Sequence, residues 1–193
     1  MRAVIAIFAA LFLGAVPGAP SVARAETCPP PPDHGARLAE LIGAVQAARS
    51  EAEARRISNQ MWELWADAPN EQAQAILDRG MRRRAGHDFL GALDAFDRLV
   101  AYCPDYAEGY NQRAFVQFLR GDYASALVDL DRALALSPDH LGALSGKALS
   151  LLALDRIAEA RAVLLRALAL NPWLPERGLV GPGGPLAPPG RDL

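Results

Sequence analysis

Three prolines lie 34 residues apart in the second half of the chain, at Pro104, Pro138 and Pro172. Several other positions keep the same step, so that successive units hold similar residues: Ala92, Ala126 and Ala160; Phe96, Leu130 and Leu164; Gly80, Ala114 and Ala148. A fixed period of this kind is the signature of a repeat architecture, in which each unit is one supersecondary motif that buries its apolar face against its neighbours. The chain is therefore expected to fold as a stack of similar units.

The best-preserved unit, residues 107–140, reads as two helices joined by a short turn at Gly121-Asp122-Tyr123. Apolar and small residues recur at spacings of three and four in each half, which places them on one face of a helix. These faces are Tyr110, Ala114 and Gln117 in the first half, and Ala126, Leu130 and Ala133 in the second. Each unit is therefore expected to be an antiparallel helix pair.

Small residues at Ala114 and Ala126 have a steric reason. Two helices approach closely only where alanine or glycine stands at the crossing of their axes, and larger residues then fill the flanking grooves. Proline after the second helix has no amide hydrogen and disfavours a helical conformation at the preceding residue. It therefore ends one unit before the next begins.

The motifs Tyr110-x3-Ala114, Gly121-Asp122-Tyr123-x2-Ala126, Leu130-x2-Ala133 and Pro138 resemble the signature of the tetratricopeptide repeat. The resemblance implies an all-α, right-handed solenoid of antiparallel helix pairs, with three clear repeats at residues 73–106, 107–140 and 141–174. The first repeat places its turn glycine one position early, in Gly86-His87-Asp88, and the third has Asp155-Arg156 where glycine would stand. Residues 37–72, which close at Ala68-Pro69-Asn70, resemble a degenerate fourth pair.

The N-terminal residues 1–25 have the features of a secretory signal peptide: Arg2, the apolar run Val4–Val16, and small residues at Ala23 and Ala25. The apolar run is about 13 residues, shorter than the roughly 20 that a membrane-spanning helix needs. We therefore expect cleavage after Ala25, a periplasmic or secreted protein, and no integral membrane span after cleavage. A proline-rich leader, residues 26–36, then precedes the helices.

The C-terminal residues 175–193 are rich in proline and glycine, and are expected to form a flexible or extended tail. Helical-repeat proteins often end in a polar capping element, and the sequence offers no such helix. Trp173, Leu174, the tail or a partner must then cover Leu164, Leu168 and Leu170. A homo-oligomer formed through this uncapped C-terminal face is one option.

Loss of residues 1–25 removes two arginines and no acid, so the formal net charge changes from −2 to −4. This balance gives no basic stripe of the kind that binds nucleic acid, and we expect no nucleic-acid partner.

Cys28 and Cys103 both remain after cleavage. Thiols of an exported protein tend to pair in an oxidising compartment, but a cysteine at a helix end is also often a buried free thiol. Both interpretations of Cys28 and Cys103 stay open.

No motif in the remaining chain predicts catalysis. The sequence lacks a nucleophile elbow, a phosphate-binding glycine loop and a dinucleotide fingerprint, and Cys103 has no candidate base to activate it. His34, His87 and His140 stand alone in the leader and in two turns, without the spacing of metal ligands, and are expected to be solvated. We therefore expect no enzyme, no cofactor and no metal.

The first helix of each repeat is expected to line a concave groove, as the resemblance implies. Each residue turns by about 100° along a helix, so the positions beside the inward face point into this groove. They are Leu77, Met81, Arg84, Asn111, Phe115, Phe118, Leu149 and Leu152. Met81, Phe115 and Leu149 are expected nearest its centre, whereas Phe118 and Leu152 could equally pack between adjacent first helices. An exposed apolar patch of this kind tends to mark an interaction site.

The expected function is that of an exported adaptor that binds a protein or peptide in this groove. The family's best-known mode grips a terminal carboxylate with lysine, asparagine and arginine at set positions. Those positions hold Leu77, Met81, Gln112, Gly142 and Gly146 here, so that mode is not expected. The alternative function is a structural subunit of a cell-envelope assembly that buries the uncapped C-terminal face.

Overall fold

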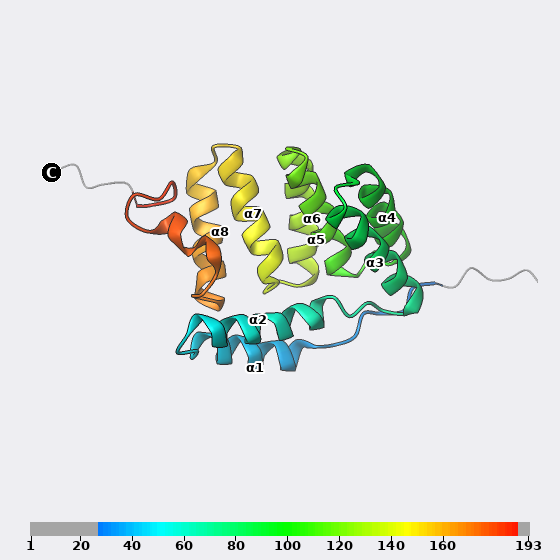
Figure 1. Cartoon of the computed structure of the whole chain (residues 1–193), viewed down its shortest axis with the longest axis horizontal. Helices are drawn as coiled ribbons and strands as arrows, with labels where there is room; N and C mark the ends of the chain where they lie inside the picture. Colours follow the sequence, from blue (N-terminus) through cyan, green and yellow to red (C-terminus); the bar gives the residue numbers. More distant parts are fainter. Residues whose placement is uncertain (1–26, 189–193) are drawn as a thin grey trace, which may run out of the picture.

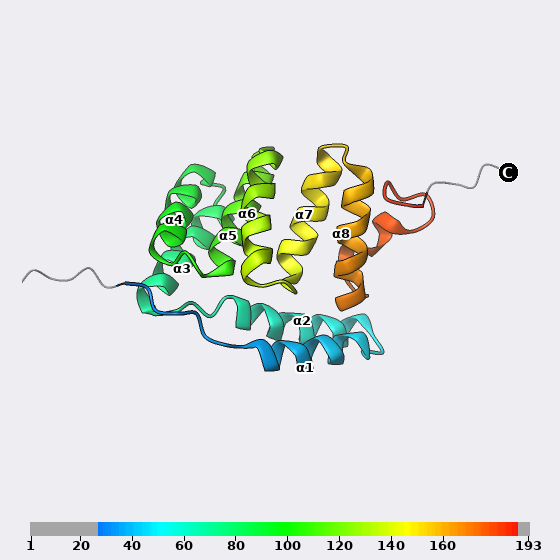
Figure 2. The same cartoon turned by 180° about the vertical axis from the view of Figure 1, so that it is seen from behind.

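The computed structural model describes residues 27–188, and every regular element in that range is helical (Figure 1). The elements are α1 (Gly35–Gln46), α2 (Glu51–Trp65), α3 (Glu71–Ala85), α4 (Phe89–Tyr102), α5 (Ala107–Leu119), α6 (Tyr123–Leu136), α7 (Leu141–Ala153), α8 (Ile157–Leu170) and the 3₁₀ helix η1 (Pro175–Val180). The expected signal peptide, residues 1–25, and residues 189–193 of the expected tail lie outside the described residues. The all-α solenoid of antiparallel helix pairs is confirmed, with α3–α8 side by side in Figures 1 and 2.

Helices α3–α8 form three pairs, α3–α4, α5–α6 and α7–α8, and each pair also packs against the next. Small residues permit the close approach within a pair, because Ala114, Ala126 and Ala160 are fully buried where larger side chains would not fit. At Gly80, an added Cβ would lie 2.4 Å from Cε1 of Phe96. The alternation of small and large residues therefore sets the distance between the helices.

The turn inside each pair places one residue in the left-handed region of backbone conformation. This residue is Gly121 in the central pair, with φ of 79°, His87 in the first pair, with φ of 62°, and Asp155 in the third, with φ of 58°. All three stand at the same position of the 34-residue step. The early glycine, Gly86, has an ordinary φ of −82°. His87 and Asp155 thus adopt a conformation that glycine takes without steric cost.

The degenerate N-terminal pair is present as α1 and α2, but it does not extend the stack. Both helices lie crosswise to α7 and α8 along one end of the repeats, as Figures 1 and 2 show, and α1 contacts α8. The hydroxyl of Tyr106 donates to the carbonyl oxygen of Trp65 at 2.9 Å, and Nδ2 of Asn171 donates to Oγ of Ser58 at 3.1 Å. These contacts fix the pair against the ends of the repeats rather than against the outer face of α3 and α4.

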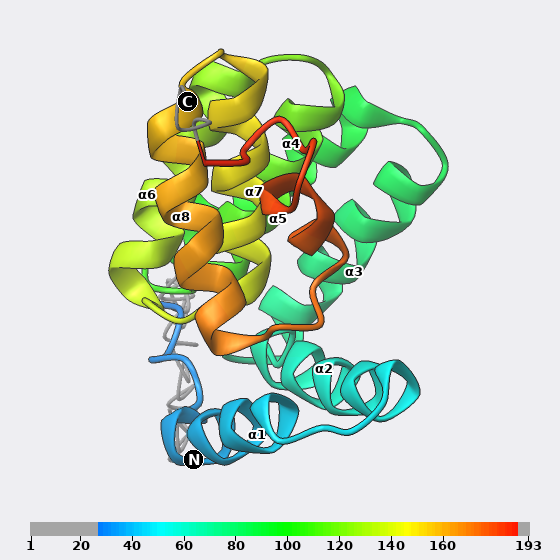
Figure 3. The ribbon, with the colours of Figure 1, turned by 90° about the vertical axis from the view of Figure 1, so that its left-hand side faces the viewer.

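Residues 175–188 cover the last repeat. Leu186 is fully buried against the core of α7 and α8, and Leu179 and Val180 pack on the same core. Nη1 of Arg161 donates to the carbonyl oxygen of Leu186 at 2.6 Å, and Figure 3 shows the segment beside α8. The expectation of a flexible or extended tail is therefore wrong for these residues, because three apolar side chains among the prolines and glycines give the segment a core contact. The C-terminal face is not uncapped.

Cys28 and Cys103 form a disulfide, with their Cα atoms 5.2 Å apart. Cys103 follows the last residue of α4 and is 2% exposed. The bond ties the leader to the end of α4. Between the disulfide and α1, residues 29–34 run along the end of the repeats, as the blue segment in Figure 2 shows.

Candidate functional site

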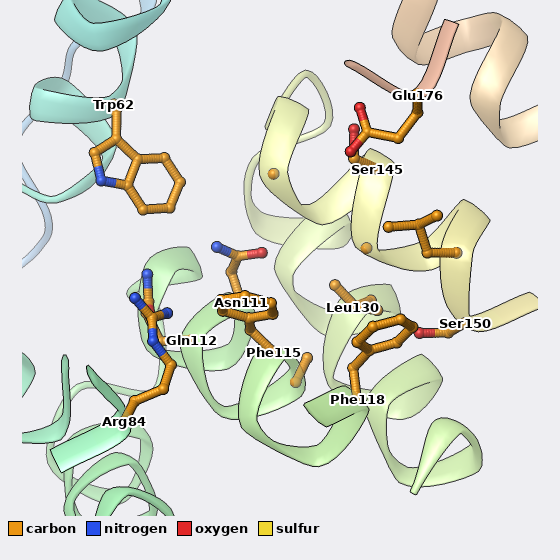
Figure 4. Close-up of a pocket in the computed structure, with 14 residues that line it drawn as sticks. Trp62, Arg84, Asn111, Gln112, Phe115, Phe118, Leu130, Ser145, Ser150 and Glu176 are labelled. Atoms are coloured by element: carbon orange, nitrogen blue, oxygen red, sulfur yellow. The ribbon is translucent and has the colours of Figure 1, made fainter. Parts of the chain in front are cut away.

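A pocket of about 260 Å³ opens on the side of the stack that is formed by the first helices of the three pairs, α3, α5 and α7. Helices α5 and α7 contribute most of its lining, and α3 contributes Arg84. Trp62 from α2 and Glu176 from η1 stand over two different sides of it (Figure 4). With Leu130 of α6, six separate elements therefore meet at one opening.

Five of the eight predicted groove residues are brought together here: Arg84, Asn111, Phe115, Phe118 and Leu149. Phe115 is the most accessible large apolar side chain of the pocket, with 45% of its surface exposed. The ring of Phe118 is half-buried and does more than pack between first helices, since it also lines the opening. The pocket therefore combines an apolar floor with access from solvent.

The other three predicted residues, Leu77, Met81 and Leu152, do not line the pocket. Leu77 is fully buried in the core between α3 and α4. Met81 lies one helical turn later on the same face, and packs half-buried against that core. Leu152 packs half-buried against the core of α7 and α8. The prediction that these residues line the groove, with Met81 near its centre, is wrong because each turns toward its own helix pair.

The pocket residues Trp62 and Glu176 were missed because they belong to segments outside the repeat register, whereas Ser150 was missed although it lies on α7 within the register. One sequence signal could have found the first, since Trp62 and Trp65 are three residues apart and share a helix face. No comparable signal marks Glu176. Gln112, Gly142 and Gly146, which the sequence analysis compared with the carboxylate-gripping positions, also line the pocket.

A buried acid, Glu108, organises the polar side of the site and is 1% exposed. It accepts hydrogen bonds from Nε2 of Gln112 and from Nδ2 of Asn111, the latter at 2.9 Å. Oε1 of Gln112 in turn accepts a hydrogen bond from Arg84. Burial lowers the pKa of Arg84, and the negative charge of Glu108 acts in the opposite direction. The charge of Arg84 is thus balanced by a carboxylate within the same network.

His140 completes this network from the turn before α7. Its Nδ1 accepts from the backbone N–H of Ala143 at 3.3 Å, so Nε2 carries the proton and donates to Glu108 at 2.9 Å. The expectation that His140 is solvated is wrong, since it is fully buried. The reason is that α2 covers this turn, with Trp65 stacked on the imidazole.

Arg84 also holds one aromatic ring in place. Its guanidinium carbon lies 4.6 Å from the centroid of the Phe115 ring, a cation–π contact. Phe118 packs at a tilt on Tyr123, with ring centroids 5.3 Å apart. Both phenylalanines of the floor are therefore positioned by neighbours within the fold.

The described residues 27–188 contain neither a candidate membrane span nor a candidate metal site. None of the helices there combines the length and the hydropathy needed to cross a bilayer. Over the same residues, no three side chains of histidine, cysteine, aspartate or glutamate gather as metal ligands would.

Comparison with known sequences identifies the repeats. The tetratricopeptide-repeat family model matches residues 117–173. A TPR repeat-containing protein of Rhizobium etli is 31% identical over 87 residues, which cover 45% of this chain and 43% of that protein. A tetratricopeptide repeat protein 36 homolog of Nematostella vectensis is 43% identical over 44 residues, 23% of this chain and 24% of that protein. The chain thus spans less than half the length of the curated relatives that it matches.

Solved structures show the same fold. The first TPR of Spaghetti (RPAP3), bound to the HSP90 peptide SRMEEVD, has a TM-score of 0.55 at 24% identity, over 56% of this chain and 87% of that one. The TPR2B-domain:pHsp70 complex of yeast Sti1 has a TM-score of 0.51 at 23% identity, over 52% of this chain and 81% of that one. Residues 117–173 thus match the tetratricopeptide repeat, and the stacked helix pairs of the chain have the fold of solved tetratricopeptide-repeat domains.

Proposed function

We propose that the chain is an exported, non-catalytic adaptor that binds a segment of a partner protein in the pocket between α3, α5 and α7. The observation that carries this proposal is the apolar floor made by Phe115, Phe118 and Leu149, in which Phe115 is 45% exposed. Partly exposed aromatic side chains in a concave site are typical anchors of protein recognition. The partner is therefore a protein or peptide.

The solved relatives support a peptide as the occupant. The first TPR of Spaghetti is bound to an HSP90 peptide, and a second structure is a complex of Sti1 with pHsp70. The positions that would grip a terminal carboxylate in the family's best-known mode hold leucine, methionine, glutamine and glycine in this chain. We therefore propose that apolar side chains, rather than a terminal carboxylate, anchor the bound segment.

Export is supported by the features of residues 1–25 and by the Cys28–Cys103 disulfide, because such bonds persist in oxidising compartments. We propose that the exported form begins at Glu26. Intact-mass analysis of protein recovered from outside the cytoplasm tests this. A mass that includes residues 1–25 would contradict it.

The alternative function, a structural subunit of an envelope assembly, depended on an uncapped C-terminal face. Leu186 and its neighbours cover that face. The same finding removes the feature on which a homo-oligomer through this face depended. Neither is proposed further.

Peptide selection tests the adaptor function directly. Peptides selected from a random displayed library against the purified protein provide ligands whose Kd can be measured by fluorescence anisotropy. Phe115→Ser should weaken their binding at least tenfold, about 1.4 kcal/mol, because it removes the exposed part of the apolar floor. Val128→Ser is the matched control, since Val128 is 71% exposed on α6 and does not line the pocket.

Stability must be followed alongside binding. Phe115→Ser should leave the circular dichroism spectrum and the melting temperature close to those of the wild type, because the side chain is already half in solvent. Undiminished binding by the folded variant would place the binding site elsewhere. A large fall in melting temperature would show that Phe115 is part of the core.

A further inference from the structure

Two oxygen atoms on one wall of the pocket have no hydrogen-bond partner among the described residues: Oγ of Ser145, a residue that is 8% exposed, and Oε2 of Glu176. Oγ of Ser150 also lacks a partner, but Ser150 is fully buried and lies more than one turn farther along α7, so it is not part of this group. Figure 4 shows the Glu176 carboxylate directed back toward Ser145, across the opening from Trp62. Buried polar atoms are almost always hydrogen-bonded in folded proteins. Two facing oxygen atoms without partners on one wall of a pocket therefore indicate that a ligand supplies the missing donor.

Cations close to Glu176 in the fold are engaged elsewhere. Arg177, the next residue, donates to the carbonyl oxygens of Trp173 and Leu174 at 3.0 and 3.2 Å, and lies 3.4 Å from a carboxylate oxygen of Glu51. Lys147 on α7 pairs with Asp131. Arg84 stands on the opposite wall, where Glu108 balances its charge. The unpaired carboxylate thus leaves this wall of the pocket negative.

The rest of the lining suits a long apolar stem that ends in a cation. Trp62, Phe115 and Phe118 present aromatic surface to the pocket, and aromatic faces attract cations. Leu149 and the phenylalanine rings offer apolar surface to a methylene chain. Lysine combines four methylenes with an ammonium group that has three donors. The rotatable donors of an ammonium group on this flexible stem can turn to both oxygen atoms, whereas the planar, forked donor set of arginine is fixed in direction.

We propose that the pocket selects a lysine side chain on the bound segment, with the ammonium group donating to the carboxylate of Glu176 and to the hydroxyl of Ser145. The inference rests on the proposed function and names the chemistry of the segment that binds. An acidic side chain would meet the unpaired carboxylate of Glu176 and is disfavoured. An apolar side chain would leave the two oxygen atoms without a donor.

The test uses five capped, fluorescein-labelled peptides, Ser-Gly-Phe-Xaa-Phe-Gly-Ser, in which Xaa is lysine, arginine, glutamine, norleucine or glutamate. The flanking phenylalanines supply apolar anchors and are constant. By fluorescence anisotropy, the lysine peptide should bind at least tenfold more tightly than the norleucine peptide, which has a similar stem without the charge. Glu176→Gln should abolish that preference. Glu159→Gln is the matched control, because Glu159 is exposed and pairs with Arg156 on the surface.

Each result separates the inference from the proposed function. Equal affinity for the lysine and norleucine peptides, tighter binding of the arginine or glutamate peptide, or a lysine preference that survives Glu176→Gln would overturn the lysine inference. The adaptor proposal would still stand if Phe115→Ser weakened all peptides. Binding that Phe115→Ser leaves unchanged would overturn both. Absence of measurable binding to any of the five peptides would overturn the lysine inference, and the peptides selected from the random library would then decide the adaptor proposal.

Discussion

The imidazole of His140 lies stacked on the indole of Trp65, with ring centroids 4.4 Å apart and 18° between the ring planes. This contact joins the end of α2 to the start of α7, and both residues are buried. It packs the crosswise α1–α2 pair against the ends of the repeats. Because Trp62 comes from the same helix, this interface also positions one wall of the pocket.

Trp65→Ala should lower the free energy of unfolding by about 3 to 5 kcal/mol, the usual cost of removing a large buried aromatic side chain. Urea denaturation followed by circular dichroism measures it. His34→Ala is the control, since His34 and Asp67 form a solvent-accessible pair at 2.8 Å and such pairs contribute about 0 to 1 kcal/mol. Similar losses of unfolding free energy in the two variants would show that the Trp65 contact does not hold helices α1 and α2 in place.

The sequence predicted the three repeats well because their contacts are local. Each helix packs mainly on the next one, so the residues that meet lie within one or two steps of the 34-residue period. Equivalent positions of successive repeats, such as Ala126 and Ala160, therefore hold similar residues because they pack in the same way. The same argument explains why the register placed Asp155 at the turn position although it is not glycine, whereas the early Gly86 misplaced that position by one residue in the first repeat.

The candidate site was predicted only in part, because it is completed by segments that break the register. Trp62 reaches the pocket only when α2 lies across the repeats, and Glu176 does so only when η1 folds back. Neither arrangement is encoded in a local pattern. The prediction for Met81 was wrong although Met81 keeps the register. Its position matches that of Phe115, but in the first pair the side chain packs against the core of α3 and α4.

Gly121→Ala should destabilise the protein by about 1 kcal/mol, because φ of 79° is a conformation in which a Cβ costs about 1 to 2 kcal/mol. No atom lies within 4 Å of the added Cβ, so the cost comes from the backbone alone. Gly86→Ala is the matched control with an ordinary φ of −82°, and should not destabilise. Asp155→Gly should act in the opposite direction to Gly121→Ala and raise the melting temperature. Equal effects of the two glycine substitutions would refute this account.

The Cys28–Cys103 disulfide closes a sequence separation of 75 residues. In the chain-entropy model, closing such a loop stabilises the folded state by about 4 kcal/mol, and any strain in the bond reduces this value. Thiol titration under denaturing, non-reducing conditions should find no free thiol in the exported protein, and two free thiols per chain would refute the pairing. Reduction should lower the melting temperature of the wild type, but should have no effect on Cys28→Ser, which already lacks the bond.

Leu186→Ala tests whether the C-terminal segment is a true cover of the last repeat. Leu186 is fully buried on the core of α7 and α8, so its truncation should cost about 2 to 5 kcal/mol. Leu165→Ala is the control on α8, because Leu165 is 43% exposed and its loss should cost much less. Urea denaturation gives both values. If Leu186→Ala costs no more than Leu165→Ala, the segment is not docked, and Glu176 is then not held at the pocket either.

Peptide binding by Leu186→Ala gives the second readout. Since η1 is held in part through Leu186, the lysine preference should weaken in this variant while the effect of Phe115→Ser persists.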